Sequence, residues 1–159
     1  MPDGREVTVG FSLAIASSPA APWLGTFACQ HFMPDYYAQP DYQRHENTAL
    51  TVGEVWISGP RAQGLAGYFE TMTGGSVMRK PGRTDIATAA GTVVLADPHT
   101  FEAAFGAPPP HPEDGPHLAG LTIQCRSLDA LADRGLAKIG DRLVLPAEKA
   151  FGTAVAFSA

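Results

Sequence analysis

Glu54 has the strongest case for a chemical role, because it is a carboxylate inside the apolar run 52–57. On a strand it would share a face with Trp56, since side chains two residues apart point the same way. Burying a charged carboxylate alone is costly, so Glu54 must be solvated in a cavity, paired or protonated. A pocket role and a solvent-exposed sheet face fit this pattern equally well. We take Glu54 as the best catalytic candidate and Trp56 as a ligand-binding candidate.

His31 follows Phe27 and Cys29 at alternating positions of a second apolar run. An imidazole there could bind a metal or transfer a proton. The simpler interpretation, which we favour, is a buried histidine hydrogen-bonded to backbone or water. Tyr37 and His45 lie in the aperiodic segment 33–50, and long loops of this kind often carry function. A tyrosine there could line a cleft or hold the loop against the core.

A group of cations, Arg79, Lys80 and Arg83, surrounds a turn at Pro81-Gly82. A solvated face, or charge that protects an edge strand from unwanted pairing, is the usual reason for such a group. A clamp for an anionic ligand is the lesser alternative.

The composition narrows the class of protein and its partners. A chain of 159 residues with 45% hydrophobic and 17% charged residues is expected to form a packed core. A net charge of −5 with no basic run argues against nucleic acid or an anionic membrane surface, and favours a small organic ligand. Cys29 and Cys125 lie in apolar runs without metal-type spacing, so we expect buried, reduced thiols. No membrane span or signal peptide is evident, which indicates the cytoplasm.

The elements that must position these residues follow from periodicity and turn signals. Helices are expected at 65–72, ending at Gly74, and at 127–135. A further short helix is expected after Asp97 as N-cap and Pro98 as first residue, burying Phe101 and Phe105. The expected strands lie at 7–15, 27–32, 52–57, 76–80, 84–89, 92–96, 118–123, 142–145 and 153–157. The order indicates two tandem β-α-β-β units, 51–106 and 117–159, joined by the proline-rich linker 107–116. The fold class is therefore α+β, with the units paired around a shared curved sheet and helices on the outer face.

The first 50 residues hold two strands and a long loop, and begin with an Asp3-Gly4 turn that has no preceding strand to connect. An unpaired strand edge is an association hazard that proteins usually cover. We therefore expect a second copy of the chain, or a preceding segment, to cover this edge, and a homodimer through the N-terminal strands is the partner we predict.

Several segments together resemble the glyoxalase-like proteins of the vicinal oxygen chelate superfamily. They are Val9-Gly10-Phe11-Ser12-Leu13-Ala14, Cys29-Gln30-His31-Phe32, Tyr42-Gln43-Arg44-His45, Leu118-Ala119-Gly120-Leu121-Thr122-Ile123, Asp141-Arg142-Leu143-Val144-Leu145-Pro146 and Ala150-Phe151-Gly152. The resemblance implies paired β-α-β-β-β modules forming a cupped sheet, and likens this sequence to the C-terminal part of a longer multi-module chain. On this view residues 1–50 complete a preceding module.

The resemblance also implies a divalent metal that polarises vicinal oxygens of a substrate. It makes His31 and Glu54 candidate metal ligands, and adds Gln30 and His45 to the ligand-binding candidates. Where related chains commonly carry a terminal glutamate, this sequence has Val155-Ala156-Phe157, and alanine cannot bind a metal.

Three functions remain open on the sequence. The first is a metal-assisted lyase, isomerase or dioxygenase-type enzyme. The second is a non-catalytic protein that sequesters a small ligand, which the missing glutamate favours. The third is a structural half that dimerises with a catalytic partner.

Overall fold

The computed structural model describes residue 1 and residues 3–159, and in this part of the chain ten strands form two sheets. The strands are β1 Phe11–Ser18, β2 Ala21–His31, β3 Ala49–Ser58, β4 Ser76–Lys80, β5 Arg83–Ala87, β6 Thr92–Ala96, β7 His117–Cys125, β8 Ala137–Ile139, β9 Arg142–Leu145 and β10 Ala154–Ser158. The helices are α1 Ala66–Thr73 and α2 Pro98–Phe105. Short 3-10 turns are η1 Pro34–Tyr36, η2 Pro40–Tyr42, η3 Ala62–Leu65, η4 Pro112–Asp114, η5 Asp129–Leu131 and η6 Ala147–Lys149.

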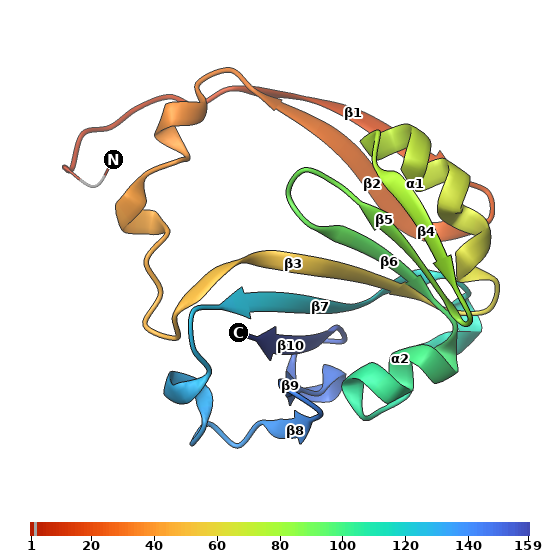
Figure 1. Cartoon of the computed structure of the whole chain (residues 1–159). Helices are drawn as coiled ribbons and strands as arrows, with labels where there is room; N and C mark the ends of the chain where they lie inside the picture. The colour runs from red at the N-terminus through yellow and green to blue at the C-terminus, as the bar shows by residue number, and fades with distance from the viewer. Residues whose placement is uncertain (2) are drawn as a thin grey trace.

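The larger sheet has the strand order β4-β5-β6-β3-β7-β10-β9-β8. Its two halves match, because β6 runs parallel to β3 and β10 runs parallel to β7, while the outer strands of each half are antiparallel. We call β3, α1 and β4–β6 module one, and β7–β10 module two. The antiparallel pair β3 and β7 joins them, and we call this pair the seam (Figure 1). The predicted α+β fold of paired modules is confirmed.

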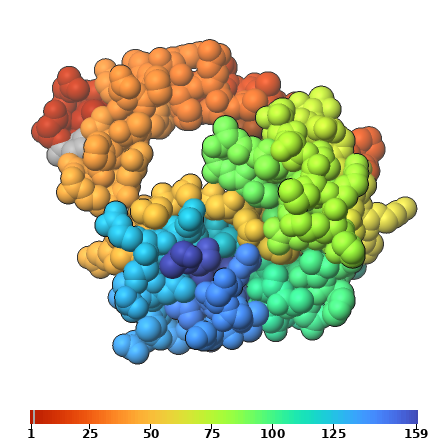
Figure 2. Space-filling model, viewed as in Figure 1, coloured from red at the N-terminus to blue at the C-terminus, as the bar shows by residue number. Residues whose placement is uncertain are grey.

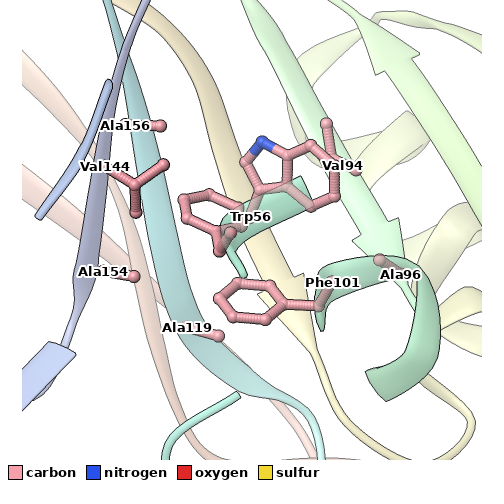
Figure 3. Close-up of a cluster of buried hydrophobic side chains, with 9 residues drawn as sticks. Trp56, Val94, Ala96, Phe101, Ala119, Val144, Ala154 and Ala156 are labelled. Atoms are coloured by element: carbon pink, nitrogen blue, oxygen red, sulfur yellow. The ribbon is translucent and has the colours of Figure 1, made fainter. Parts of the chain in front are cut away.

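The two faces of this sheet carry separate hydrophobic cores. On one face, α1 packs Ala66 and Phe69 against Ile57, Ile86 and Leu95. On the other, α2 brings its stacked rings Phe101 and Phe105 onto Trp56, and the small residues of module two complete the cluster (Figure 3). We call these surfaces the α1 face and the α2 face, and the two helices do not share a face.

Local sequence explains the start and end of α2. Asp97 accepts a hydrogen bond from the Thr100 amide at 2.7 Å and Pro98 occupies the first turn, which satisfies an orphan N–H and presets the helical backbone. Gly106 ends the helix in a left-handed conformation that favours glycine. The short helix predicted to begin at Pro98 is confirmed together with its Asp97 cap and its buried Phe101 and Phe105.

β1 and β2 form a two-stranded sheet of their own, which we call the arm. Its turn end packs on the α1 core through the buried Ala21, and Thr26 is hydrogen-bonded to Tyr68 on α1. The remainder extends away from the larger sheet. Figure 2 shows an opening through the molecule between the arm with the following loop and the sheet. Most side chains of the arm are therefore in solvent.

The exposed arm overturns two expectations. Cys29 was expected to be buried, as was His31 in the interpretation that we favoured. Both side chains are exposed, because this part of β2 extends away from the larger sheet. Cys125 on β7 is buried, as predicted, and both cysteines are free thiols. Alternating apolar residues gave the correct pairing of the two strands, although β1 begins at Phe11 rather than at residue 7.

Module two differs from expectation in its helix. Residues 127–135 were expected to be helical, but only the turn η5 forms there. The Ser127 hydroxyl accepts from the Asp129 amide at 3.0 Å and donates to the Asp129 carboxylate at 2.7 Å, which favours a tight local turn. A nine-residue stretch has little helical stability of its own. The short strand β8, which was not predicted, follows this turn and edges the sheet.

Candidate functional site

Glu54 lies at the seam on the α2 face, and its carboxylate accepts hydrogen bonds from both modules. Oε1 accepts from Arg83 at 2.9 Å. Oε2 accepts from Arg142 at 3.0 Å, from the Thr122 hydroxyl at 2.9 Å and from the Trp56 indole N–H at 3.0 Å. Of the three states that the sequence allowed for this residue, the paired state is the one that forms.

The two arginines occupy matching places in the two modules. Arg83 is the first residue of β5 and follows the turn at Gly82, whereas Arg142 is the first residue of β9 and follows the turn at Gly140. Because β5 and β9 lie at the same distance from the seam in the palindromic order, both side chains reach Glu54 from opposite sides. The internal repeat thus builds a pair of guanidinium groups on one carboxylate.

Module one contributes a second carboxylate. Asp85 accepts from Arg83 Nε and, at 3.0 Å, from Lys80 Nζ. We call Glu54, Trp56, Arg83, Asp85, Thr122 and Arg142 the Glu54 cluster. Together, the Glu54 cluster and Lys80 contain three cationic side chains and two carboxylates. The site therefore has an excess of positive charge, in a chain whose net charge is −5.

Trp56 forms the floor of the cluster. The side chain is 1% exposed, and the Arg83 guanidinium lies 4.6 Å from its ring centroid, with that of Arg142 at 5.7 Å. Cations over an indole face are attracted by the ring. The tryptophan thus supports both arginines from below while its N–H holds Glu54.

The surroundings fix the charge states of the cluster. Burial by itself raises the pKa of Glu54, but the hydrogen bond from Trp56, the charge of Arg142 and the hydrogen bonds from Arg83 and Thr122 outweigh it and lower the pKa below its ordinary value. For Arg83, burial lowers the pKa, but its bonds to Asp85 and Glu54 prevail and raise it. The carboxylate and the guanidinium are therefore both charged at neutral pH.

These contacts test whether the implied divalent metal fits. Both oxygens of Glu54 are already occupied by donors, and the two adjacent guanidinium groups would repel a further cation. Among the residues that the structure describes, no group of three or more His, Cys, Asp and Glu side chains could hold a metal ion. Ala156 on β10, which pairs with Thr122 on β7, has no side-chain atom that could bind a metal. The cluster does not fit a divalent metal.

An apolar cavity of about 400 Å³ opens beside the same core, lined by Phe101, Phe105 and Ala154 and by prolines of the linker. This volume falls in the range of ligand pockets. Its lining does not include the Glu54 cluster, so the cavity and the cluster are separate features, and both adjoin the aromatic side chains of α2.

At the seam the structure brings two of the predicted site residues together, Glu54 and Trp56. His31 lies on β2 in the separate sheet, where its ring is 4.1 Å from that of Tyr37 and its Nε2 is 3.7 Å from Cys29 Sγ. Gln30 is the neighbouring exposed residue of the arm, and His45 lies in the loop after η2. The assignment of His31 and Glu54 as a ligand pair stays a prediction, and they lie in different sheets.

Sequence reasoning missed Arg142, Asp85 and Thr122. Arg83 was noted only as part of a surface cluster, with an anionic-ligand clamp as the lesser alternative. A signal was available for Arg142, because it stands immediately after a glycine-containing turn at the start of a strand, as Arg83 does. Aligning the two units on these turns would have paired the arginines.

Comparison with known proteins supports the fold. No protein-family model and no curated protein sequence matches the chain. Among solved structures it is similar to methylmalonyl-CoA epimerase from Mycobacterium tuberculosis, with a TM-score of 0.50 and 13% identity over 76% of this chain and 96% of that chain. A second methylmalonyl-CoA epimerase matches with a TM-score of 0.44 and 14% identity, over 71% of this chain and 97% of that one.

The strand order and the first of these similarities define the class: the chain has the paired-module fold of the vicinal oxygen chelate superfamily. The resemblance predicted from sequence is confirmed at the level of fold. An identity of 13% says nothing of substrate or reaction. Within the described residues, no helix has the length and apolar character needed to span a bilayer.

Proposed function

We propose that the chain binds a small organic molecule at the Glu54 cluster, by hydrogen bonds and charge rather than through a divalent metal. The observation that carries this proposal is the meeting of Arg83 and Arg142, one from each module, on a single carboxylate at the seam. Convergent polar groups that fix the orientation of a ligand are typical of small-molecule sites.

Binding is better supported than proton-transfer catalysis. An effective general base has a pKa near the working pH. Glu54 has a lowered pKa and both of its oxygens accept hydrogen bonds from cations, so it is a weak base and a poor proton acceptor. The role that suits Glu54 is to hold the two guanidinium groups in place. This reassigns our best catalytic candidate to a positioning role.

The binding site can be located by NMR on the 15N-labelled protein with mixtures of small alcohols, ketones, amides and carboxylates. We expect shifts concentrated on the Trp56 indole N–H, the Arg83 and Arg142 side chains and the Thr122 amide. Shifts confined to the cavity beside α2 or to the arm would refute binding at the Glu54 cluster, as would a complete absence of shifts.

The metal can be tested by elemental analysis of the purified protein before and after chelation, with His31→Ala and Glu54→Ala variants alongside. We expect no stoichiometric divalent metal in the wild type and unchanged NMR shifts after chelation. Near-stoichiometric metal that either variant loses would overturn the metal-free proposal and favour the metal-assisted lyase or isomerase.

A second candidate function, assembly with another copy of the chain, is favoured by the arm. The cross-strand pairs Leu13 with Cys29 and Ile15 with Phe27 lie on one apolar face, to which Phe11 and Trp23 also belong. Ile15 is 80% exposed and Trp23 73%. A two-stranded hairpin is at best marginally stable in water on its own. The apolar face of the arm therefore needs a cover.

We infer that this cover is the same face of a second copy. At 150–250 Å² for a large side chain, the face exposes roughly 600 Å² of apolar surface, about the most that a monomer normally leaves uncovered. Two such faces packed together bury roughly 1,200 Å², the lower bound for a specific interface. Ile15→Lys with Phe27→Lys should give a monomer in light scattering, while Met78→Lys, on β4 and as exposed as Phe27, should not. A wild type that is monomeric at every concentration would refute the dimer.

A further inference from the structure

We infer that Arg83 and Arg142 together recognise an oxyanion, so that the ligand of the Glu54 cluster is a small organic acid. This inference rests on the proposed function and adds the charge class of the ligand. It follows from the unused hydrogen-bond donors, the local charge and the geometry of the pair.

The two guanidinium groups have donors to spare. A guanidinium carries five N–H bonds. Arg83 uses Nε for Asp85 and Nη2 for Glu54, and Arg142 uses Nη2 for Glu54 and Nη1 for Thr122 at 3.4 Å. Each guanidinium makes no other hydrogen bond to the described part of the chain, so three N–H bonds on each group are not used by the protein. The side chains are 22% and 21% exposed, so part of each reaches solvent.

Local charge favours an anion at these donors. Glu54 holds two like charges close together by bonding one of them at each oxygen. Asp85 neutralises part of the Arg83 charge, but Lys80 shares the same carboxylate. A bound carboxylate or phosphate would balance the remaining positive charge. Charged hydrogen bonds to such groups are among the stronger ones in proteins, and the planar fork of arginine matches two oxygens at once.

The arginines are also preorganised for this role. Trp56 supports them from below, Glu54 joins them, and each begins a strand of a different module. A ligand would therefore find two oriented donors without having to order two long side chains, which lowers the entropic cost of binding.

Trp56 can report ligand binding by its fluorescence, because the chain has two tryptophans and the other, Trp23, lies on the arm. In a Trp23→Phe background, all tryptophan fluorescence comes from Trp56. We would titrate this protein at constant ionic strength with malonate, with its neutral amide analogue malonamide, and with inorganic phosphate. We expect a saturable change with malonate and none with malonamide. Phosphate binding tighter than malonate would identify a phosphate-bearing acid as the oxyanion source.

Two variants of Arg142 separate recognition from general charge. We expect Arg142→Gln to raise the malonate dissociation constant at least tenfold, and Arg142→Lys, which keeps the charge but loses the fork, to raise it severalfold. Arg79→Gln, an exposed arginine on the edge strand, should leave it unchanged. If Arg142→Gln does not fold, as judged by circular dichroism, Arg142→Lys decides the matter.

Equal responses to malonate and malonamide, or equal malonate binding by wild type and Arg142→Lys, would overturn the inference. The NMR experiment then separates the two levels. Neutral compounds that shift the Glu54 cluster would leave the proposed function standing without the oxyanion. A cluster that no compound shifts would remove both.

Discussion

Glu54 stays charged in a largely buried place because donors from four strands surround it. Trp56 lies on β3, Arg83 on β5, Thr122 on β7 and Arg142 on β9. Removing one partner from a buried ion pair is more damaging than replacing the whole pair, since an uncompensated charge remains. The carboxylate shared by two cations is therefore the most sensitive member of the cluster.

We predict that Glu54→Gln lowers the free energy of unfolding by about 2–3 kcal/mol, because two partly buried guanidinium groups lose their common counter-charge. Urea denaturation measures this. Glu102→Gln on the exposed side of α2 removes the same charge from a side chain that makes no ion pair with the described residues. It should change stability by about 0.5 kcal/mol or less. Equal effects of the two substitutions would contradict the assigned role of Glu54.

The pH dependence follows from the lowered pKa of Glu54. A carboxyl whose folded pKa is depressed stabilises the fold fully above its unfolded value, near 4.5, and this stabilisation is lost as the pH falls through the folded pKa. We predict that unfolding free energy falls more steeply below pH 4.5 in the wild type than in Glu54→Gln. Parallel pH profiles from urea titrations would show that Glu54 is not the group responsible.

At the residue scale, the sequence indicated that Glu54 must be solvated, paired or protonated, but it did not select the paired state or name the partners. Its nearest partner in sequence, Trp56, was expected to share its face. The two arginines lie 29 and 88 residues away, and only the pairing of strands brings them together. Residues that meet across a seam leave no periodic signal in a single sequence, which is why Arg142 was missed.

At the scale of elements, α2 and β7 approach closely at Gly120. A Cβ atom on this glycine would lie 2.7 Å from Phe105 Cζ and 3.1 Å from Phe101 Cε2. Two stacked rings leave no room for this methyl group, so the helix or the rings must shift. The glycine thus sets the distance between the helix and the sheet.

We predict that Gly120→Ala lowers the free energy of unfolding by about 1–3 kcal/mol through overpacking. Gly67→Ala on α1 is the matched control, because nothing lies within 4 Å of its added Cβ. There the same substitution should stabilise by about 0.5–1 kcal/mol, since alanine loses less backbone freedom on folding. Thermal or urea unfolding compares the two, and the same sign for both would refute the contact.

The strands and helices of module one were predictable because each carries its own turn, cap or glycine stop. Strand β6 matches its predicted bounds, and α1 ends at Gly74 as expected. Helix α2, which follows module one, begins at Pro98 after its Asp97 cap, as predicted. The helix of module two was wrong, because residues 127–135 have helical periodicity without enough length or packing to keep it. Burial of the arm was also wrong, because alternation shows that a face is apolar but does not show what covers it.

At the scale of the whole molecule, the symmetric strand order brings two matching arginines to the seam, but the residues of the seam itself differ between the modules. Glu54 pairs with Thr122 across the seam, so one module supplies the carboxylate and the other a hydroxyl. A duplicated architecture can therefore hold an asymmetric site. The functional proposal depends on this difference, because a carboxylate in place of Thr122 as well would cancel the remaining positive charge that an acid could bind.

The two cysteines differ in exposure, so the rates at which a thiol reagent modifies them report on two different parts of the molecule. Cys29 is exposed on the apolar face of the arm, whereas Cys125 is 3% exposed at the end of β7 and its burial raises the pKa of the thiol. Thiolate is the reactive form, so a thiol reagent should modify one cysteine rapidly and the other only as the sheet opens. Cys29→Ser should remove the fast phase, and two fast phases would contradict the burial of Cys125.

The same thiol-modification experiment reports on both the arm and the seam without an added label. If copies of the chain associate through the arm, raising the protein concentration slows the fast phase, because the partner covers Cys29. The slow phase, by contrast, follows the stability of the seam, and Glu54→Gln should accelerate it. One absorbance trace would then report assembly in its first part and the opening of the paired modules in its second.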